Sequence, residues 1–172
     1  MCIRDRVWFT RQRKTAEGDV TQLLTYVRRD SHKDKRQYDV FGGQVDPADH
    51  GPHTYATCAR REISEELVLS PAMEEALECS LAQAPDGHET VHLLHHHRRH
   101  HVVYWFVPTG DDCRCCLTPA GGWEACNGSV RWRNASKVID NLAKFRFAQP
   151  IVALLRLQFS SEPLSPDYTA RG

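Results

Sequence analysis

Three glutamates, Glu62, Glu65 and Glu66, lie close together in a stretch that we predict to be helical. At about 3.6 residues per turn, their side chains fall within a sector of about 100° beside the apolar face of the helix. Like charges on one sector repel each other. Hard cations such as Mg²⁺ prefer carboxylate oxygens and often bridge to substrate phosphates, so a bound ion would offset that repulsion. The alternative interpretation is a solvated acidic surface, which is common for runs of charge.

The helix itself is predicted from an apolar stripe that faces the core: Ala56, Ala59, Ile63 and Leu67. Thr54 is the expected N-cap of this helix, because its hydroxyl can accept a backbone hydrogen bond. Arg61 stands four residues before Glu65 and can form an ion pair with it.

A glycine-rich loop precedes the helix. Gly42 and Gly43 permit backbone angles that are closed to other residues, so that a carbonyl can turn toward a bound cation. Loop and helix together match the pattern G-x5-E-x7-R-E-U-x-E-E-x-G-U, in which U is a bulky apolar residue. This pattern is the Nudix box, and the chain resembles a Nudix hydrolase.

Most positions of the box are present in this sequence. Gly43 takes the first glycine, Asp49 takes the first acid as Asp in place of Glu, and Leu69 takes the last apolar position. The segment Arg61–Glu66 matches R-E-U-x-E-E without a mismatch.

The sequence also departs from the box in its spacing and near its end. The gap of seven residues is here eleven, from His50 to Arg60, and we assign the surplus to a loop over His50–His53. A loop can lengthen at small cost in free energy. Val68 stands where the box has its last glycine. Because a β-branched residue is poorly suited to a left-handed helix cap, the box does not predict how this helix ends.

The resemblance implies both a fold and an activity. The implied fold is α/β (α+β), an α/β/α sandwich with a mixed β-sheet, whereas periodicity alone indicates only a mixture of helices and strands. The implied activity is that of a metal-dependent pyrophosphohydrolase, which cleaves the phosphoanhydride of a nucleoside diphosphate linked to another moiety. The alternative is a catalytically inactive Nudix-fold module for nucleotide binding or interaction. The longer gap and Val68 motivate this alternative, and the retention of all three glutamates argues against it.

The cofactor that the resemblance implies is Mg²⁺, with Mn²⁺ as the other candidate. Glu62, Glu65 and Glu66 would hold the ion, helped by the carbonyl of Gly43. The ion would neutralise charge on the pyrophosphate and lower the pKa of a water molecule. Glu62 or Glu66 would accept the proton, and Arg61 would orient the glutamates.

Three further residues are candidates for contact with the substrate. Arg28 or Arg29, at the end of a predicted strand, would face the phosphates, and a solvated strand end is the alternative. Phe147 lies in an aromatic and arginine segment that would border the ligand pocket, and packing in the core is the alternative. The run G-G-x-x-D-P-x-D at residues 42–49 is shared with coenzyme A pyrophosphatases of the family. ADP-ribose, diadenosine polyphosphates and oxidised nucleotides remain open as substrates.

Histidine and cysteine clusters provide a different hypothesis, a protein that binds transition metals. Seven of the ten histidines lie between His88 and His101. We interpret them first as a polar loop or strand end, then as a rim that attracts phosphate, and last as a zinc site. Four cysteines follow without the paired C-x2-C spacing of structural zinc sites, so we expect free thiols in a loop. These are Cys113, Cys115, Cys116 and Cys126.

Length and composition indicate one domain. The 172-residue chain has no net charge with histidine neutral, so charge gives no strong attraction to nucleic acid or to a membrane. Seven cysteines, an odd number, favour a reduced compartment, and we expect a cytoplasmic protein. The domain is expected over residues 7–159, followed by a loose tail over 160–172. Met1–Arg6 resemble translated sequencing adaptor, and we expect a non-native N-terminus that leaves the first strand truncated.

The other elements are predicted from β-branched and aromatic runs and from apolar stripes. Strands are expected at Val7–Thr10, Val20–Val27, Tyr38–Phe41, Val102–Pro108 and Ser129–Trp132. Helices are expected at Met73–Cys79, Ala135–Leu142 and Ile151–Phe159. Pro71 is expected to stop the helix of the glutamates, and Leu81–Gly87 to form a loop.

Overall fold

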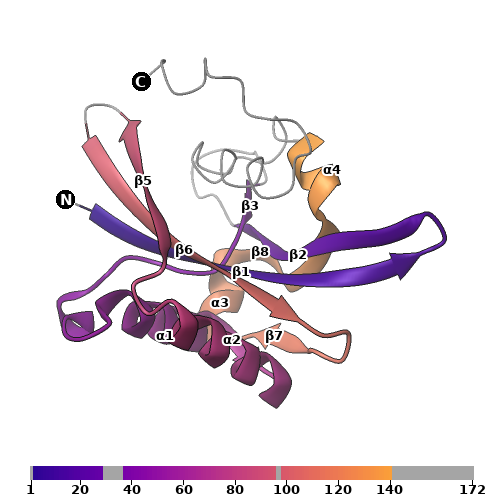
Figure 1. Cartoon of the computed structure of the whole chain (residues 1–172), viewed down its shortest axis with the longest axis horizontal. Helices are drawn as coiled ribbons and strands as arrows, with labels where there is room; N and C mark the ends of the chain where they lie inside the picture. Colours follow the sequence, from indigo (N-terminus) through magenta and orange to yellow (C-terminus); the bar gives the residue numbers. More distant parts are fainter. Residues whose placement is uncertain (1, 29–36, 96–97, 141–172) are drawn as a thin grey trace.

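The computed structural model of the chain describes residues 2–28, 37–95 and 98–140 (Figure 1). Its centre is one sheet with the strand order β3-β2-β1-β6-β5, in which β8 also pairs with β2. β1 and β6 run parallel, and the other neighbours run antiparallel. The mixed sheet is therefore confirmed. The strands are β1 (Cys2–Thr15), β2 (Gly18–Arg28), β3 (Gln37–Asp39), β5 (His88–His95), β6 (Arg98–Thr109) and β8 (Ala125–Asn134).

Two long helices cover one face of this sheet, and a small second sheet lies beside them (Figure 1). The long helices are α1 (Thr54–Glu66) and α2 (Pro71–Gln83). The second sheet pairs β4 (Leu67–Leu69) with β7 (Cys115–Leu117) in antiparallel register. The short elements are the 3-10 helix η1 (Pro47–Asp49), α3 (Pro119–Glu124) and α4 (Ala135–Asp140).

The core forms because both long helices carry an apolar stripe. On α1, Ala56, Ala59 and Ile63 are buried, as the sequence predicts. On α2, Met73, Leu77 and Leu81 recur every four residues and are buried as well. Both stripes pack on side chains of β1, β2 and β6, among them Phe9 and Trp105. Each large apolar side chain buried in this way contributes about 1.5–3 kcal/mol.

The boundaries of the helices around Pro71 differ from the prediction. α1 ends at Glu66, and Pro71 is the first residue of α2 instead of the stop signal of α1. A proline is tolerated in the first turn of a helix, where its missing N–H would have no partner inside the helix. α2 then continues to Gln83, so the predicted loop over Leu81–Gly87 is wrong in its first part. A turn does follow, with Gly87 at a φ of 76°.

Both β1 and β6 extend beyond the bounds that we predict from the sequence. Cys2–Arg6, in which we predicted no strand, form the first part of β1 and pair with residues 100–104 of β6. The described residues of the histidine-rich segment lie in β5 and at the start of β6, so a strand end fits them and a polar loop does not. Whether it attracts phosphate or zinc stays a prediction.

The predicted helix at Ile151–Phe159 and the tail over 160–172 lie outside the described residues. α4 begins at Ala135 as predicted and packs on β2 and β8. Within the described part of the chain, no helix is long and apolar enough to cross a membrane.

Candidate active site

The glycine loop after β3 is held against β1. The N–H of Val7 donates to the carbonyl of Phe41 at 2.9 Å, and the N–H of Asp5 donates to the carbonyl of Gly43 at 3.1 Å. Gly42 has a φ of 124°, and a Cβ there would lie 2.5 Å from the carbonyl oxygen of Asp5. The loop therefore needs glycine at position 42 for both its backbone angle and its close approach to β1.

Gly43 is required for a different reason, which involves the helix. A Cβ at this position would overlap the carboxylate of Glu62. The side chain of Glu62 is 15% exposed and fills the space that Gly43 leaves open. The carbonyl of Gly43 accepts one hydrogen bond from Asp5, which leaves it a second lone pair.

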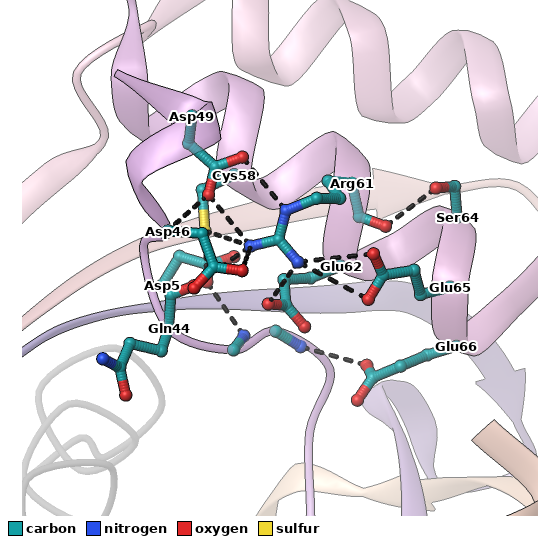
Figure 2. Close-up of polar contacts among 12 residues, drawn as sticks. Asp5, Gln44, Asp46, Asp49, Cys58, Arg61, Glu62, Ser64, Glu65 and Glu66 are labelled. Carbon is teal, nitrogen blue, oxygen red and sulfur yellow. Dashed lines mark hydrogen bonds and ion pairs between the residues drawn. The ribbon is translucent and has the colours of Figure 1, made fainter. Parts of the chain in front are cut away.

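The other two glutamates differ in their contacts: Glu66 reaches the same loop, whereas Glu65 points toward Arg61 (Figure 2). The Oε2 atom of Glu66 accepts a hydrogen bond from the N–H of Gly42 at 3.1 Å. Glu65 is more exposed, at 54%, and lies 3.4 Å from the Nη1 atom of Arg61. The predicted ion pair between Arg61 and Glu65 is present, although it is the longer of the contacts that Arg61 makes with this helix face.

Arg61 is the centre of the polar network (Figure 2). Its Nε and Nη2 atoms donate to the two carboxylate oxygens of Asp49 at 3.0 and 2.9 Å. Its Nη1 atom lies 2.9 Å from Glu62, and Nη2 also donates to the carbonyl of Gln44 at 3.0 Å. A bidentate pair of this kind fixes the guanidinium plane. Arg61 thus connects η1, the glycine loop and the glutamates.

Burial and pairing shift the ionisation of this network. Asp49 is 3% exposed, and its hydrogen bonds from Arg61 lower its pKa to about 2. The same pair raises the pKa of Arg61. Burial raises the pKa of Glu62, and the neighbouring Arg61 opposes this shift. Asp49, whose pKa is lowered in this way, therefore stays ionised at neutral pH and holds Arg61 in place.

Two residues of the site were missed from the sequence. Asp5 is buried, and its Oδ1 atom accepts hydrogen bonds from the N–H of Gly43 at 2.9 Å and from the thiol of Cys58 at 3.3 Å. Its Oδ2 atom has no hydrogen-bond partner among the described residues, and burial raises the pKa of Asp5. Nothing in the spacing predicts Asp5. Cys58 could have been found, because it precedes Arg61 and Glu62 by three and four residues on the same helix.

The donor set fits a hard divalent cation. Carboxylates of Glu62 and Glu66 flank the glycine loop from one side, and oxygen ligands of this kind suit Mg²⁺ and Mn²⁺. Among the residues that the structure describes, no three His, Cys, Asp or Glu side chains converge on one point. The glutamates contact other protein groups: Glu65 pairs with Arg61, and Glu66 accepts a hydrogen bond from Gly42.

The remaining candidates fall largely outside the described side chains. Arg28 is the last residue of β2, as predicted, while Arg29 and Phe147 lie outside the described residues. Cys113, Cys115 and Cys116 are free thiols, as expected, but the last two lie in β7 and not in a loop. Burial raises the pKa of Cys115 to about 11.

Comparisons with known proteins show the family and the fold of the chain. A sequence model of the NUDIX domain matches residues 7–115. Similar solved structures include a NUDIX hydrolase from Alicyclobacillus acidocaldarius, with a TM-score of 0.58, 14% identity and 90% of each chain covered. The Ap4A hydrolase of C. elegans in a binary complex gives a TM-score of 0.51 and 19% identity, with 91% of this chain and 93% of that chain covered. The MutT protein of Methanosarcina mazei gives a TM-score of 0.52 and 14% identity, with 93% of this chain and 96% of that chain covered. The search of curated proteins found no significant match to the sequence.

Because the domain match spans more than half of the chain, the protein belongs to the Nudix family. It is a hydrolase that acts on phosphoanhydrides. Members of this family generally use divalent metal ions.

Proposed function

We propose that this Nudix hydrolase is a Mg²⁺-dependent pyrophosphohydrolase, with Mn²⁺ as the alternative ion. Its substrate is a nucleoside diphosphate linked to another moiety. The observation that carries the proposal is the contact between helix and loop. Glu62 occupies the space beside Gly43 that a Cβ would fill, and Glu66 accepts a hydrogen bond from Gly42. Two carboxylates are thus held at one backbone bend, where a cation could join them to a diphosphate.

Glu62, Glu65, Glu66 and the carbonyl of Gly43 would hold the ion. When bound, Mg²⁺ supplies neutralisation of the pyrophosphate charge and a water of lowered pKa. The protein residues do the positioning. Arg61 fixes Glu62 through a contact of 2.9 Å and Glu65 through one of 3.4 Å. Glu62 or Glu66 accepts the proton of the attacking water, because both carboxylates lie at the loop.

The nucleotide substrate is proposed from the chemistry of the site and from one similar solved structure. Phosphoryl transfer is catalysed mainly by placement and electrostatics, which a motif with three carboxylates and one arginine supplies. The C. elegans relative is an Ap4A hydrolase. Diadenosine tetraphosphate is therefore the first substrate to assay, beside ADP-ribose, coenzyme A and oxidised nucleoside triphosphates.

The test is hydrolysis with Mg²⁺ across this panel, followed as phosphate released after coupling to a phosphatase. We expect turnover by the wild type and a loss of at least about 100-fold in Glu66→Gln, or about 2.7 kcal/mol of barrier. Glu66→Gln keeps an oxygen that can accept from Gly42 N–H, so the loop contact survives. The matched control is Glu75→Gln on the exposed surface of α2, which should leave the rate unchanged.

Two results would contradict the proposal in different ways. Equal rates in the wild type and in Glu66→Gln would remove Glu66 from the mechanism. A wild type that binds nucleotides tightly and turns over none of them would identify a binding module without catalysis.

A further inference from the structure

The two glutamates at the end of α1 lie where a helix is least restrained. Glu65 and Glu66 are its last two residues. The last four carbonyls of any helix have no partner inside it. Leu67 follows with extended backbone angles, and its N–H donates to the carbonyl of Ile63. The carbonyls of Glu65 and Glu66 therefore need partners from elsewhere in the protein.

Thr118 provides those partners. Its N–H donates to the carbonyl of Glu66 at 3.0 Å, and its hydroxyl donates to the carbonyl of Glu65. Pairing of β4 with β7 brings Thr118 to this place, because Leu67 lies opposite Leu117 in the register. One residue, distant in sequence, thus closes the end of the helix that carries the glutamates.

The same threonine begins the next helix. The Oγ1 atom of Thr118 accepts from the N–H of Gly121 at 3.1 Å, and its carbonyl accepts from the N–H of Gly122 at 2.7 Å. A Cβ on Gly121 would overlap the backbone of Glu66, whereas a Cβ on Gly122 would meet nothing within 4 Å. The start of α3 is therefore packed directly on the end of α1, beside β7 (Figure 1).

We propose that Thr118 and Gly121 are positioning residues, which set the direction of Glu65 and Glu66 and thereby the affinity of the site for its divalent metal ion. The proposal rests on the proposed function of these glutamates. It also explains how the chain functions with Val68 where the box has glycine. A left-handed glycine would supply a helix cap from the local backbone. Here the cap comes from Thr118, and Val68 stays in an extended strand.

The effect on metal affinity follows from geometry. Mg²⁺ demands near-ideal octahedral positions from its ligands, so small displacements of a carboxylate weaken binding. Loss of residues that orient metal ligands typically costs about 10–100-fold in affinity or activity. Thr118 acts through the backbone of Glu65 and Glu66, because its N–H and its hydroxyl donate to their carbonyls.

The first experiment compares Thr118→Val with Thr118→Ser. Valine has the shape of threonine and lacks the hydroxyl, whereas serine keeps it. Direct Mn²⁺ binding, measured by electron paramagnetic resonance of the free ion, and the Mg²⁺ concentration for half-maximal hydrolysis are the two readouts. We expect about tenfold weaker Mn²⁺ binding and a matching rise in the Mg²⁺ requirement for Thr118→Val. Thr118→Ser should bind like the wild type.

The second experiment uses the two neighbouring glycines as a matched pair. Gly121→Ala should displace the end of α1 and weaken Mn²⁺ binding, and Gly122→Ala should not. Circular dichroism at the assay temperature confirms that each variant is folded. This pair tests the inference even where Thr118→Val does not fold.

The outcomes separate this inference from the proposed function. A wild type that neither binds Mn²⁺ nor hydrolyses any substrate overturns the proposed function, and the inference with it. A wild type that does both, together with folded Thr118→Val and Gly121→Ala variants of unchanged Mn²⁺ affinity, overturns the inference alone.

Discussion

Gly43 lies directly against the side chain of Glu62. Because a Cβ there would overlap the Glu62 carboxylate, Gly43→Ala must push that side chain away from the loop. We expect a fall of about 100-fold in kcat/KM, the size that a displacement of about 1 Å produces in a catalytic group. The variant should keep its fold, because the displaced atoms belong to a side chain.

The control for this prediction is Gly110→Ala. A Cβ at Gly110 would lie 3.7 Å from its nearest neighbour, an ordinary contact. Steady-state kinetics and thermal unfolding of both variants are the measurements. If Gly43→Ala and Gly110→Ala retained the same kcat/KM, the close approach of Glu62 would have no part in catalysis.

The ionisation of Asp49 makes the stability of the fold depend on pH. The residue's folded-state pKa of about 2 lies below the ordinary value of 3.8. The ionised carboxylate therefore stabilises the fold above about pH 4, and this contribution is lost as the pH falls through about 2. At 1.36 kcal/mol per pKa unit it amounts to about 2 kcal/mol.

Urea unfolding of Asp49→Asn tests this dependence. The variant should be less stable than the wild type by about 2 kcal/mol or more at neutral pH, because Arg61 loses its buried partner. The difference in the free energy of unfolding should shrink as the pH approaches the folded-state pKa. A difference of equal size at neutral pH and in strong acid would show that the charge of Asp49 is not what stabilises Arg61.

Single residues were predictable from sequence where the signal is local. Arg61 and the three glutamates share one helix and Gly43 lies in the loop before it, so the sequence could place them near one another, and their roles stay predictions. Asp5 was not, because it reaches Gly43 from a strand 38 positions away. The dominant partner of Arg61 was missed for a related reason. Helical spacing favours Glu65, but a buried acid in η1 makes the shorter, bidentate contact.

At the scale of elements, the ends of helices were the least predictable. Thr54 is the first residue of α1 and not its N-cap, and its hydroxyl donates to the carbonyl of Gly51. The N-cap is His53, with a left-handed φ of 62°. At the other end, the exit of α1 depends on β7, about 50 residues further along the chain. No local pattern around Val68 contains that information.

Substitutions of Val68 test how helix α1 ends. Val68 is 55% exposed and pairs with Cys116 in an extended conformation. Val68→Gly would restore the box, yet it should destabilise the protein by about 0.5–1 kcal/mol, since glycine weakens a strand. Val68→Thr keeps β-branching and should be neutral. Thermal unfolding that ranked Val68→Gly above the wild type would mean that a left-handed cap is preferred here.

At the scale of the molecule, the order of strands could come only from the resemblance. Composition and period identify strands at Val7–Thr10 and Val102–Pro108, but not that β1 and β6 run side by side in parallel. Such a pairing joins residues 98 positions apart, and contacts of that kind leave no periodic signal in either segment. The histidine run illustrates the same limit. Histidine has no strong preference for strands, and the strand conformation of its described residues follows from pairing between β5 and β6.

The charge balance of the whole fold leads to the last prediction. Folding brings the carboxylates of Glu62 and Glu66 to one loop, and a cation that binds only this folded arrangement stabilises it by mass action. Mg²⁺ at about 100 times its dissociation constant should add about 2.7 kcal/mol. For a protein of this length that corresponds to a rise of about 5–10 °C in Tm, reversed by a chelator.

The same measurement on Glu62→Gln and Glu66→Gln distinguishes the site from general ionic effects. Each variant removes one proposed ligand charge, so its Tm should rise much less with Mg²⁺ than that of the wild type. NaCl of equal ionic strength should not raise the Tm of the wild type or of either variant as far as Mg²⁺ raises the Tm of the wild type. Without Mg²⁺, Glu66→Gln should be at least as stable as the wild type, because one repulsive charge is gone. Glu62→Gln loses the ion pair with Arg61 as well, so it should be no more stable than the wild type. An equal Mg²⁺-induced rise in wild type and variants would place the ion elsewhere on the protein.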